Sequence, residues 1–316
     1  MTTIWIEKYR PINFTNIIGQ DKNIKVLDEI ISNGSLPHLL FYGKSGVGKT
    51  STIMSLVNKL YGKNNTFMVM KLDASDDRGI NTVREEIKGF ADKMTPFNNG
   101  IKMIILDEAD SMTYEAQFAL RRIIEKYSDN TRFCLICNYE NKIIPAIKVR
   151  CLNMRFNPID KNIIISRIKN ICDIEMIKYN DESLNTIAII ANGDLRKAIN
   201  MLQSISMMNN TISPELCYDS TGIPSPELTN DILDVLNNKK IEYSEAYDYI
   251  NIHIVSKGIL ISFLLHQITN IIIADVTKNI NYPNILIDIS NLECEVAIST
   301  FDDIYMAGLV AIFKKY

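Results

Sequence analysis

The sequence predicts an α/β fold: a mostly parallel β-sheet covered by helices, followed by two helical domains. Short apolar runs alternate with helical patterns up to about residue 158, which is typical of parallel sheets with helical crossovers. A glycine-rich loop lies between the first of these runs and the helix that follows it. Beyond residue 158 the strand patterns stop. With 316 residues, of which 47% are hydrophobic, the chain can form several domains with their own cores.

Within the first half, each apolar run predicts a strand and each amphipathic stretch a helix. The expected strands are residues 38–42, 67–72, 102–107, 132–138 and 151–156. Apolar residues recur at three- and four-residue spacing in the expected helices, which are residues 21–31, 50–61, 81–93 and 114–127.

The second half shows helical patterns interrupted by one segment rich in turn formers, residues 219–227. The expected helices are residues 161–172, 181–191, 194–207, 228–236, 241–252, 258–274, 285–300 and 301–313. We therefore expect three domains, at residues 1–158, 159–222 and 223–316. The stretch 258–274 is uncharged, but polar residues such as His266 and Gln267 interrupt it and favour a buried helix over a membrane span.

Charge and cysteine content restrict the classes of function. A net charge of −3 argues against a surface that is basic throughout, so any contact with DNA is expected to be local or shared with partners. The six cysteines lack zinc-module spacing. Cys134 and Cys137 form a CxxC within an expected strand, where they point to opposite faces and are expected to be buried and reduced. The N-terminus lacks a secretory signal pattern, and we expect an intracellular protein.

The segment from Gly43 to Thr50 fits the pattern GxxxxGK(S/T), directly after a strand and before a helix. Glycines allow the backbone N–H groups to turn around phosphates, and the helix N-terminus adds partial positive charge. Lys49 is expected to reach the β- and γ-phosphates, and the Thr50 hydroxyl to bind Mg²⁺. The expected nucleotide-binding residues of this loop are Gly43, Lys44, Ser45, Gly46, Val47, Gly48, Lys49, Thr50 and Ser51.

Acidic residues follow the expected strand 102–107, at the sheet edge where ligands bind in such folds. Asp107 is expected to hold Mg²⁺ through water, and Glu108 to activate a water molecule as general base. We expect Asp110 to cap the next helix.

Two further polar residues each allow two interpretations. Asn138 lies at the end of the expected strand 132–138 and either orients the attacking water or is an ordinary turn residue. Arg196, at the start of the expected helix 194–207, either crosses to the γ-phosphate or lies on the surface.

With these residues in place, the chain resembles the small subunits of replication factor C, the sliding-clamp loader among the AAA+ ATPases. The resemblance is dense over the first two domains, whereas in the third it rests on the helical pattern and residues 221–224. Residues 130–139 and 142–146 are most similar to the eukaryotic subunit-three type. The segments that carry the resemblance to the replication factor C small subunits are Trp5 to Pro11, Leu36 to Leu40, Asp73 to Ile80, Leu106 to Asp110, Ala119 to Arg122, Ile144 to Ala146, Arg150-Cys151 and Gly193 to Ala198.

This resemblance implies an ATP- and Mg²⁺-dependent subunit of a five-membered spiral that opens a PCNA-type clamp and closes it around primer–template DNA. The second domain would be a lid and the third an oligomerisation collar. Asn138 and Arg196 would sense the nucleotide, and Arg150 would act in trans as an arginine finger on the neighbour's ATP. The residues implied to border the adenine are Tyr9, Arg10 and Pro11.

The chain departs from the family pattern in two places. Val149 replaces the serine before the arginine finger. In the phosphate loop, Lys44, Ser45 and Val47 stand where the family usually has two prolines and a threonine. Because loss of proline widens the unbound ensemble, we expect a modest fall in nucleotide affinity.

The resemblance also implies DNA contacts from helices that line the spiral. The candidates are Arg78, Arg84, Lys88 and Arg122, with a merely solvated charged face as the alternative. Ile87 and Phe90 either present an apolar surface to the clamp or pack in the core.

Two alternative functions remain open. The chain could be a nucleotide-binding scaffold subunit that mainly donates Arg150, or an AAA+ branch-migration motor, although the helical C-terminal region lacks a winged-helix hairpin pattern. The expected compartment is the nucleus for a cellular protein, or a cytoplasmic replication site for a large DNA virus.

Overall fold

The computed structural model describes residues 4–62, 65–74, 80–93, 100–209, 211–274, 281–296, 298 and 302–316. By internal packing the chain falls into two compact units. One comprises Met1–Met176 with Leu184–Gln203, and the other Ile177–Ser183 with Ser204–Tyr316. Each is treated by itself below. The three expected domains remain a prediction.

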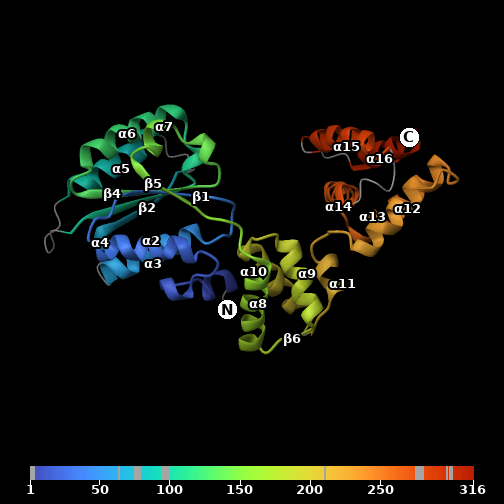
Figure 1. Ribbon diagram of the computed structural model, residues 1–316, viewed down its shortest axis with the longest axis horizontal. Helices are drawn as coiled ribbons and strands as arrows, with labels where there is room; N and C mark the ends of the chain where they lie inside the picture. Colours follow the sequence, from blue (N-terminus) through green and yellow to red (C-terminus); the bar gives the residue numbers. More distant parts are fainter. Residues whose placement is uncertain are drawn as a thin grey trace. The chain divides into compact units, whose positions relative to one another are not determined.

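A parallel five-stranded sheet forms the centre of the first unit (Figure 1). The strand order is β2-β3-β4-β1-β5, and every pairing in the register is parallel. The carboxyl ends of all five strands therefore lie at one edge, where ligands bind in α/β folds. The strands are β1 (His38–Tyr42), β2 (Val69–Asp73), β3 (Lys102–Asp107), β4 (Thr131–Cys137) and β5 (Cys151–Arg155).

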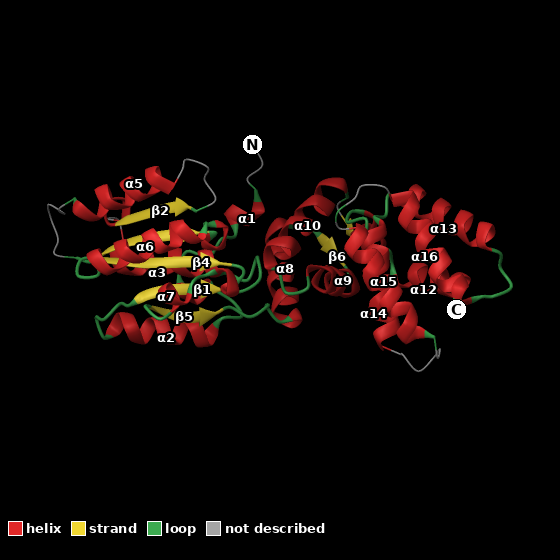
Figure 2. Ribbon diagram, turned by 90° about the horizontal axis from the view of Figure 1, so that it is seen from above, coloured by secondary structure: helices red, strands yellow, loops and turns green. Residues whose placement is uncertain are grey.

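Helices cover both faces of this sheet (Figures 1 and 2). On one face lie α2 (Asp21–Ser32) and α3 (Lys49–Tyr61), and on the other α5 (Ile80–Asp92), α6 (Tyr114–Tyr127) and α7 (Pro145–Lys148). Two apolar cores fill the spaces between sheet and helices. Cys134 belongs to the α2/α3 core and Cys137 to the opposite one, as expected for residues three apart on a strand.

Most expected elements of the first half are confirmed to within two residues. The strands at 38–42 and 102–107 and the helix at 114–127 have the expected bounds. The expected strand 67–72 begins later, at Val69, because Phe67 and Met68 belong to a short helix. The short helices of this region are α1 (Trp5–Lys8), η1 (Phe14–Asn16), α4 (Asn65–Met68), η3 (Ala109–Ser111) and η4 (Glu140–Lys142).

The structure decides between core and clamp surface for Ile87. Its side chain is 1% exposed and packs in the core between α5 and the sheet. Phe90 is partly buried against the same core. The interpretation that Ile87 presents an apolar surface to a clamp is therefore wrong. The apolar face of α5, which carries Ile87, packs against the sheet instead.

After β5 the chain becomes mainly helical. It forms α8 (Lys161–Glu175), α9 (Asp181–Ala191) and α10 (Leu195–Met208), with a two-stranded parallel ribbon of β6 (Lys178–Tyr179) and β7 (Thr211–Ile212). Asp160 caps α8, since its Oδ1 accepts a hydrogen bond from Asn162 N at 2.8 Å. The ribbon was not predicted, because two-residue strands carry no periodic pattern.

The C-terminal region consists of α11 (Pro214–Asp219), α12 (Pro226–Asn237), α13 (Tyr243–Lys257), α14 (Ile261–Ala274), α15 (Tyr282–Val296) and α16 (Asp302–Lys315). Residues from α12 to α16 share one apolar core, in which Leu264, Leu265 and Ile268 are fully buried. The expected helix 258–274 begins later, at Ile261, because Gly258 ends α13 in a left-handed conformation with φ of 60°.

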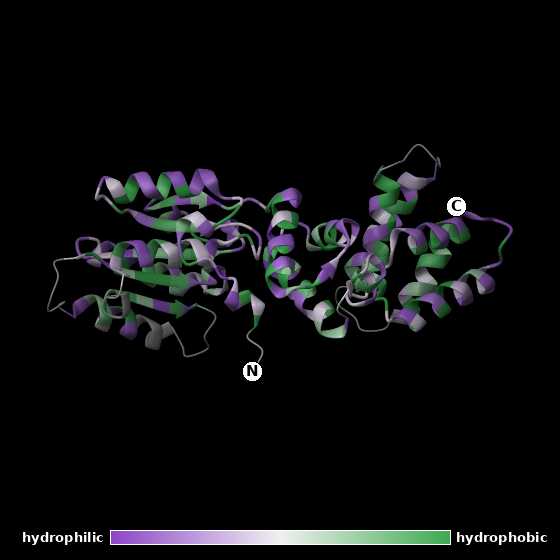
Figure 3. Ribbon diagram, turned by 90° about the horizontal axis from the view of Figure 1, so that it is seen from below, coloured by the Kyte–Doolittle hydropathy of each residue, from purple (hydrophilic) through white to green (hydrophobic). Residues whose placement is uncertain are grey.

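Hydropathy follows this packing: apolar residues run along the strands of the sheet (Figure 3). Among the described residues, no single helix has the length and apolar composition to cross a membrane. The pair α13 and α14 passes that test together, although the two helices meet at a bend of 117°.

His38 on β1 predicts how stability depends on pH. Burial, together with the nearby positive charge of Arg132, lowers the pKa of His38 from 6.5 to about 4. Its Nδ1 also accepts a hydrogen bond from Phe133 N at 3.1 Å. Because the unfolded state binds the proton more readily, this stability is present above pH 6.5 and is lost as the pH falls toward 4.

For this half-buried side chain we expect a loss of about 1–2 kcal/mol between pH 7 and pH 4, discounted for solvent screening. Urea unfolding at a series of pH values measures it. His38→Gln should reduce the pH dependence, whereas His266→Gln, at an exposed position, should preserve it. An unchanged pH dependence in His38→Gln would contradict the assignment.

Candidate nucleotide-binding site

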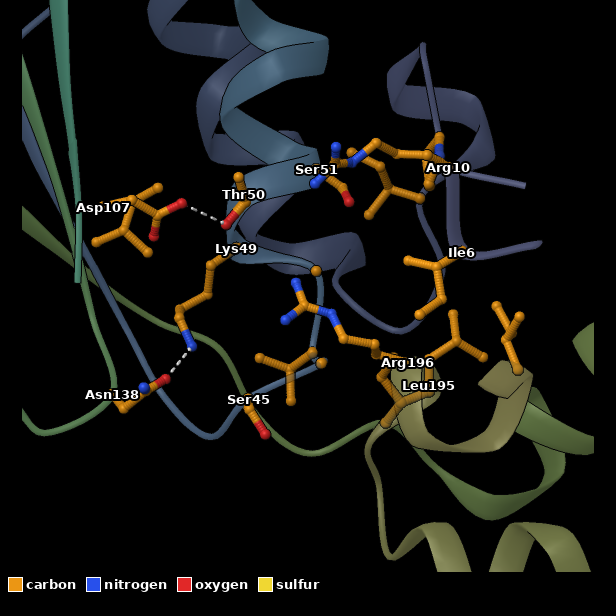
Figure 4. Close-up of a pocket in the computed structure, with 18 of the residues that line it drawn as sticks. Ile6, Arg10, Ser45, Lys49, Thr50, Ser51, Asp107, Asn138, Leu195 and Arg196 are labelled. Atoms are coloured by element: carbon orange, nitrogen blue, oxygen red, sulfur yellow. Dashed lines mark hydrogen bonds between the residues drawn. The ribbon is translucent and has the colours of Figure 1, made fainter. Parts of the chain in front are cut away.

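A pocket of about 250 Å³ lies at the carboxyl edge of the sheet, within the first unit. The phosphate loop, the ends of β3 and β4, the N-terminal segment and the start of α10 line it (Figure 4). It brings together most of the residues predicted from the sequence. Those on its wall are Tyr9, Arg10, Pro11, Ser45, Gly46, Val47, Gly48, Lys49, Thr50, Ser51, Asp107, Glu108, Asn138 and Arg196.

Lys49 begins α3, and its ammonium group lies inside the curve of the phosphate loop. Its Nζ donates to the carbonyl oxygens of Gly43 and Lys44, both at 2.7 Å, and to Asn138 Oδ1 at 2.9 Å (Figure 4). Gly43 is required for this turn, because its φ is 146° and a Cβ there would lie 2.2 Å from Phe156 O. The loop therefore holds Lys49 at its centre.

Lys49 forms no ion pair with a carboxylate among the residues that the structure describes. The residue is 7% exposed, and no described carboxylate oxygen lies within 4.0 Å of its ammonium nitrogen. Burial lowers the pKa of Lys49, with Cys137, Asp107 and Asp110 partly opposing the shift. Because a buried cation without a counter-ion is costly, a phosphate chain fits this loop by supplying the missing negative charge.

The position expected for Mg²⁺ has suitable ligands. Thr50 Oγ1 donates to Asp107 Oδ2 at 3.2 Å (Figure 4). The Lys71 ammonium on β2 lies 3.4 Å from the same carboxylate oxygen. A hydroxyl and a carboxylate beside the phosphate loop are the hard oxygen ligands that Mg²⁺ prefers. The residues present therefore fit the metal.

Glu108 and Asp110 differ in environment. Glu108 is exposed at the pocket wall and adopts a left-handed conformation with φ of 53°. Asp110 was expected to cap the next helix, and that is wrong. Thr113 caps α6 by accepting from Ala116 N. Asp110 Oδ2 instead accepts from the backbone N–H groups of Asn138 and Tyr139, at 3.2 and 3.1 Å, because η3 turns it toward the end of β4.

The structure therefore favours a site role for Asn138. Its side chain touches Lys49, and its backbone is tied to Asp110 beside the acidic segment. These two contacts fix Asn138 between the ammonium group of Lys49 and the carboxylate of Asp110. This geometry links the end of β4 to the phosphate loop and to the segment after β3.

The N-terminal segment forms the opposite wall. Ile6 and the predicted residues Tyr9, Arg10 and Pro11 line the pocket. Three contacts with α8 hold this segment. The Tyr9 hydroxyl and the Lys8 ammonium, the latter at 2.6 Å, both donate to Glu175, and an Arg167 guanidinium nitrogen donates to Tyr9 O at 3.0 Å. Burial raises the pKa of Tyr9. This wall therefore combines the apolar side chains of Ile6 and Pro11 with the polar groups of Tyr9 and Arg10.

Arg196 extends from the first turn of α10 into the pocket (Figure 4). The neighbouring Asp194 accepts a hydrogen bond from Ser45 Oγ in the phosphate loop at 2.8 Å. Arg196 is exposed to solvent and also lines the pocket, and Asp194 caps the helix that carries it, so the structure is compatible with both interpretations of Arg196. Lys44, by contrast, contributes its carbonyl oxygen to Lys49 but is absent from the pocket wall.

Arg150 lies outside this pocket. It follows α7, where its guanidinium donates to Ala146 O at 2.6 Å and to the Glu125 carboxylate on α6. Glu125 also accepts from Arg121 Nε at 3.0 Å. The side chain of Arg150 is 32% exposed, and Val149 beside it is 78% exposed. Arg150 is thus available to another molecule but cannot serve its own pocket here.

The DNA-contact candidates are only partly described. Arg78 lies outside the described residues, as does the side chain of Arg84 on α5. Lys88 is half-buried on the same helix, and Arg122 is exposed on α6. The four remain a prediction.

The sequence interpretation missed Gln20, which precedes α2. Its side chain is 4% exposed, and its Nε2 donates to Val47 O at 3.3 Å and to Asn157 O at 2.9 Å. It therefore joins the phosphate loop to the segment after β5. The neighbouring Ile17 and Ile18 line the pocket. In the sequence, Gln20 follows the apolar pair Ile17-Ile18 and the turn residue Gly19, and this pattern was the available signal for a residue at the site.

Comparisons with known families agree with this geometry. Residues 39–158 match the ATPase family associated with various cellular activities (AAA). Residues 166–207 match the RCF1/5-like AAA+ ATPase lid domain. The two matches cover the sheet, the phosphate loop and most of the three helices α8 to α10.

Curated relatives are similar over most of the chain. The probable replication factor C subunit 5 of Dictyostelium discoideum is 41% identical over 314 residues, covering 98% of this chain and 90% of that protein. Human replication factor C subunit 5 is 37% identical, covering 98% and 91%. Replication factor C subunit 3 of Saccharomyces cerevisiae is 41% identical over 274 residues, covering 85% and 80%.

Among solved structures, Thermotoga maritima RuvB, titled a Holliday junction branch migration motor, has a TM-score of 0.53. The identity is 15%, and the match covers 77% of this chain and 85% of that one. At this identity the likeness shows a shared fold alone.

Proposed function

This chain belongs to the replication factor C subunits of the AAA ATPases, and on that premise we propose that it is an ATP-hydrolysing small subunit of a clamp loader. The observation that carries the proposal is the complete set of groups in one pocket. Lys49 and the loop bind the phosphates, Thr50 and Asp107 hold Mg²⁺, and Glu108 activates water. The metal supplies neutralisation of phosphate charge when bound.

Arg150 is proposed to act on the ATP of a neighbouring subunit. Its exposure, and its distance in the fold from its own pocket, support a role in trans. Such an arginine makes hydrolysis depend on assembly. Asn138 and Arg196 are proposed to sense nucleotide within the subunit itself.

Assembly with sibling subunits is supported by the C-terminal helices. Several large apolar side chains remain exposed there in the single chain, although α12 to α16 already share a core. These are Ile252, Val255, Ile273, Ile287 and Ile304. We propose that some of these residues belong to a surface that pairs with another subunit, because contiguous exposed apolar patches mark such surfaces.

We further propose that the assembled complex opens a PCNA-type clamp and closes it on primer–template DNA. A net charge of −3 is compatible with this activity if each subunit contributes a few phosphate contacts. Arg122 and Lys88 are the described candidates. The six cysteines are free, five of them buried, which suits a reducing intracellular compartment.

The experiment replaces Glu108 by glutamine in this subunit alone, within a complex reconstituted from sibling subunits. We expect ATP binding to persist while the hydrolysis contributed by this site falls by about 100-fold, because a general base typically supplies 10²–10⁴-fold. Clamp loading should stall before release. Unchanged single-turnover hydrolysis would instead indicate a scaffold subunit that only donates Arg150. Glu115→Gln on α6, outside the pocket wall, is the matched control.

A further inference from the structure

The tip of the phosphate loop is joined to the first turn of α10. Ser45 Oγ donates to Asp194 Oδ2 at 2.8 Å, and Leu195 N donates to Gly46 O at 3.1 Å. Gly46 permits this approach, because a Cβ there would lie 1.7 Å from Asp194 Oδ1. The loop and the helix therefore pack closely, and no residue larger than glycine fits at position 46.

Asp194 has a second partner. Its Oδ1 accepts from Lys197 N at 2.9 Å, which caps the start of α10. Both carboxylate oxygens are thus engaged, one by the helix and one by the loop. This arrangement orients a negative charge that would otherwise be free to turn toward the phosphates.

The preceding residue is fixed from the other side. Gly193 O accepts from Ile159 N at 3.1 Å, and a Cβ on Gly193 would lie 2.5 Å from Pro158 Cβ. The segment that precedes Arg196 is therefore held between the end of the sheet domain and the phosphate loop. Arg196 follows directly and points into the pocket (Figure 4).

We propose that Ser45 and Asp194 are a positioning pair that holds the first turn of α10 against the phosphate loop and thereby keeps Arg196 over the nucleotide. The inference rests on the proposed function of the pocket. Ser45 stands in the loop interior, where the family resemblance leads one to expect prolines. Proline has no hydroxyl, so the bond to Asp194 depends on the residue that this chain carries.

The test measures dissociation of a fluorescent ATP analogue from the full chain by stopped flow. For Ser45→Ala we expect dissociation to be about five- to tenfold faster, the effect of losing one charge-assisted hydrogen bond. Ser45→Thr, which keeps the hydroxyl, should restore the rate to within about twofold. Ser32→Ala, which removes an exposed serine bonded to Asp28 O away from the pocket, is the matched control.

A double-mutant cycle shows whether the pair acts through Arg196. In an Arg196→Ala background, Ser45→Ala should add no further acceleration, with unchanged urea midpoints in all variants. Additive effects, or a Ser45→Ala rate equal to that of the unmodified chain, would overturn the proposal. Failure of the proposed function would give a different result. If the analogue still bound to the Lys49→Ala variant, the nucleotide would bind elsewhere and not in the phosphate loop.

Discussion

Replacing Lys49 by alanine is expected to weaken ATP binding at this subunit by at least about 100-fold, since a charge-assisted contact to phosphate is lost from a buried loop. Lys49 is the cation inside the loop, and its three acceptors are polar groups without net charge. Because burial lowers the pKa of Lys49, its removal relieves a desolvation cost, and the fold should remain stable.

Equilibrium binding of a fluorescent ATP analogue measures the loss, and urea unfolding checks the fold. Lys59→Ala provides the control, because Lys59 lies on the same helix, is exposed and pairs with Asp28 outside the pocket. Reconstituted complexes carrying Lys49→Ala should also fail to load clamps. Binding within threefold of the unmodified chain would contradict the assignment of the phosphate loop.

Replacing Arg150 by alanine is expected to slow hydrolysis in the neighbouring subunit by about 10³-fold or more, as for other arginine fingers. Binding of ATP to this subunit's own pocket should not change, because within the described part of the chain the Arg150 guanidinium bonds to Ala146 O and Glu125, which lie outside the pocket wall. The slower hydrolysis can be measured only in the assembled complex, because it concerns the neighbouring subunit's ATP.

Single-turnover hydrolysis in complexes where only the neighbouring site is active measures this effect. Arg121→Ala is the control, since Arg121 shares the partner Glu125 but precedes it on α6. Normal hydrolysis and clamp loading by the Arg150→Ala complex, with every pocket filled, would refute the role in trans.

Much of the fold was predictable because its signals are local. Five short apolar strands alternate with amphipathic helices, and the phosphate loop has a spacing that few other structures require. The placement of Lys49, Thr50 and Asp107 followed from strand ends that meet at one edge. The sequence could not decide between the two interpretations of Arg196, because that depends on how α10 packs against the loop.

The errors have the same physical origin. Asp110 has the composition of a helix cap, but tertiary contact with the end of β4 took precedence, and Thr113 caps α6 instead. Ile87 was an open choice and not an error: it lies on the apolar side of an amphipathic helix, and only packing shows that this side faces the sheet. Gln20 was missed because its two acceptors are 27 and 137 residues away.

Helix α6 runs from the acidic segment beside this subunit's pocket to Glu125, the partner of Arg150, which is proposed to act on a neighbour's ATP. Its 14 residues, about 21 Å at 1.5 Å per residue, begin just after the acidic segment and end near Glu125, which holds Arg150. A packed helix of this length moves as a stiff rod, so a small tilt at one end is carried to the other. If Arg150 acts in trans as proposed, a tilt of α6 would couple the occupancy of this pocket to the arginine offered to the next subunit.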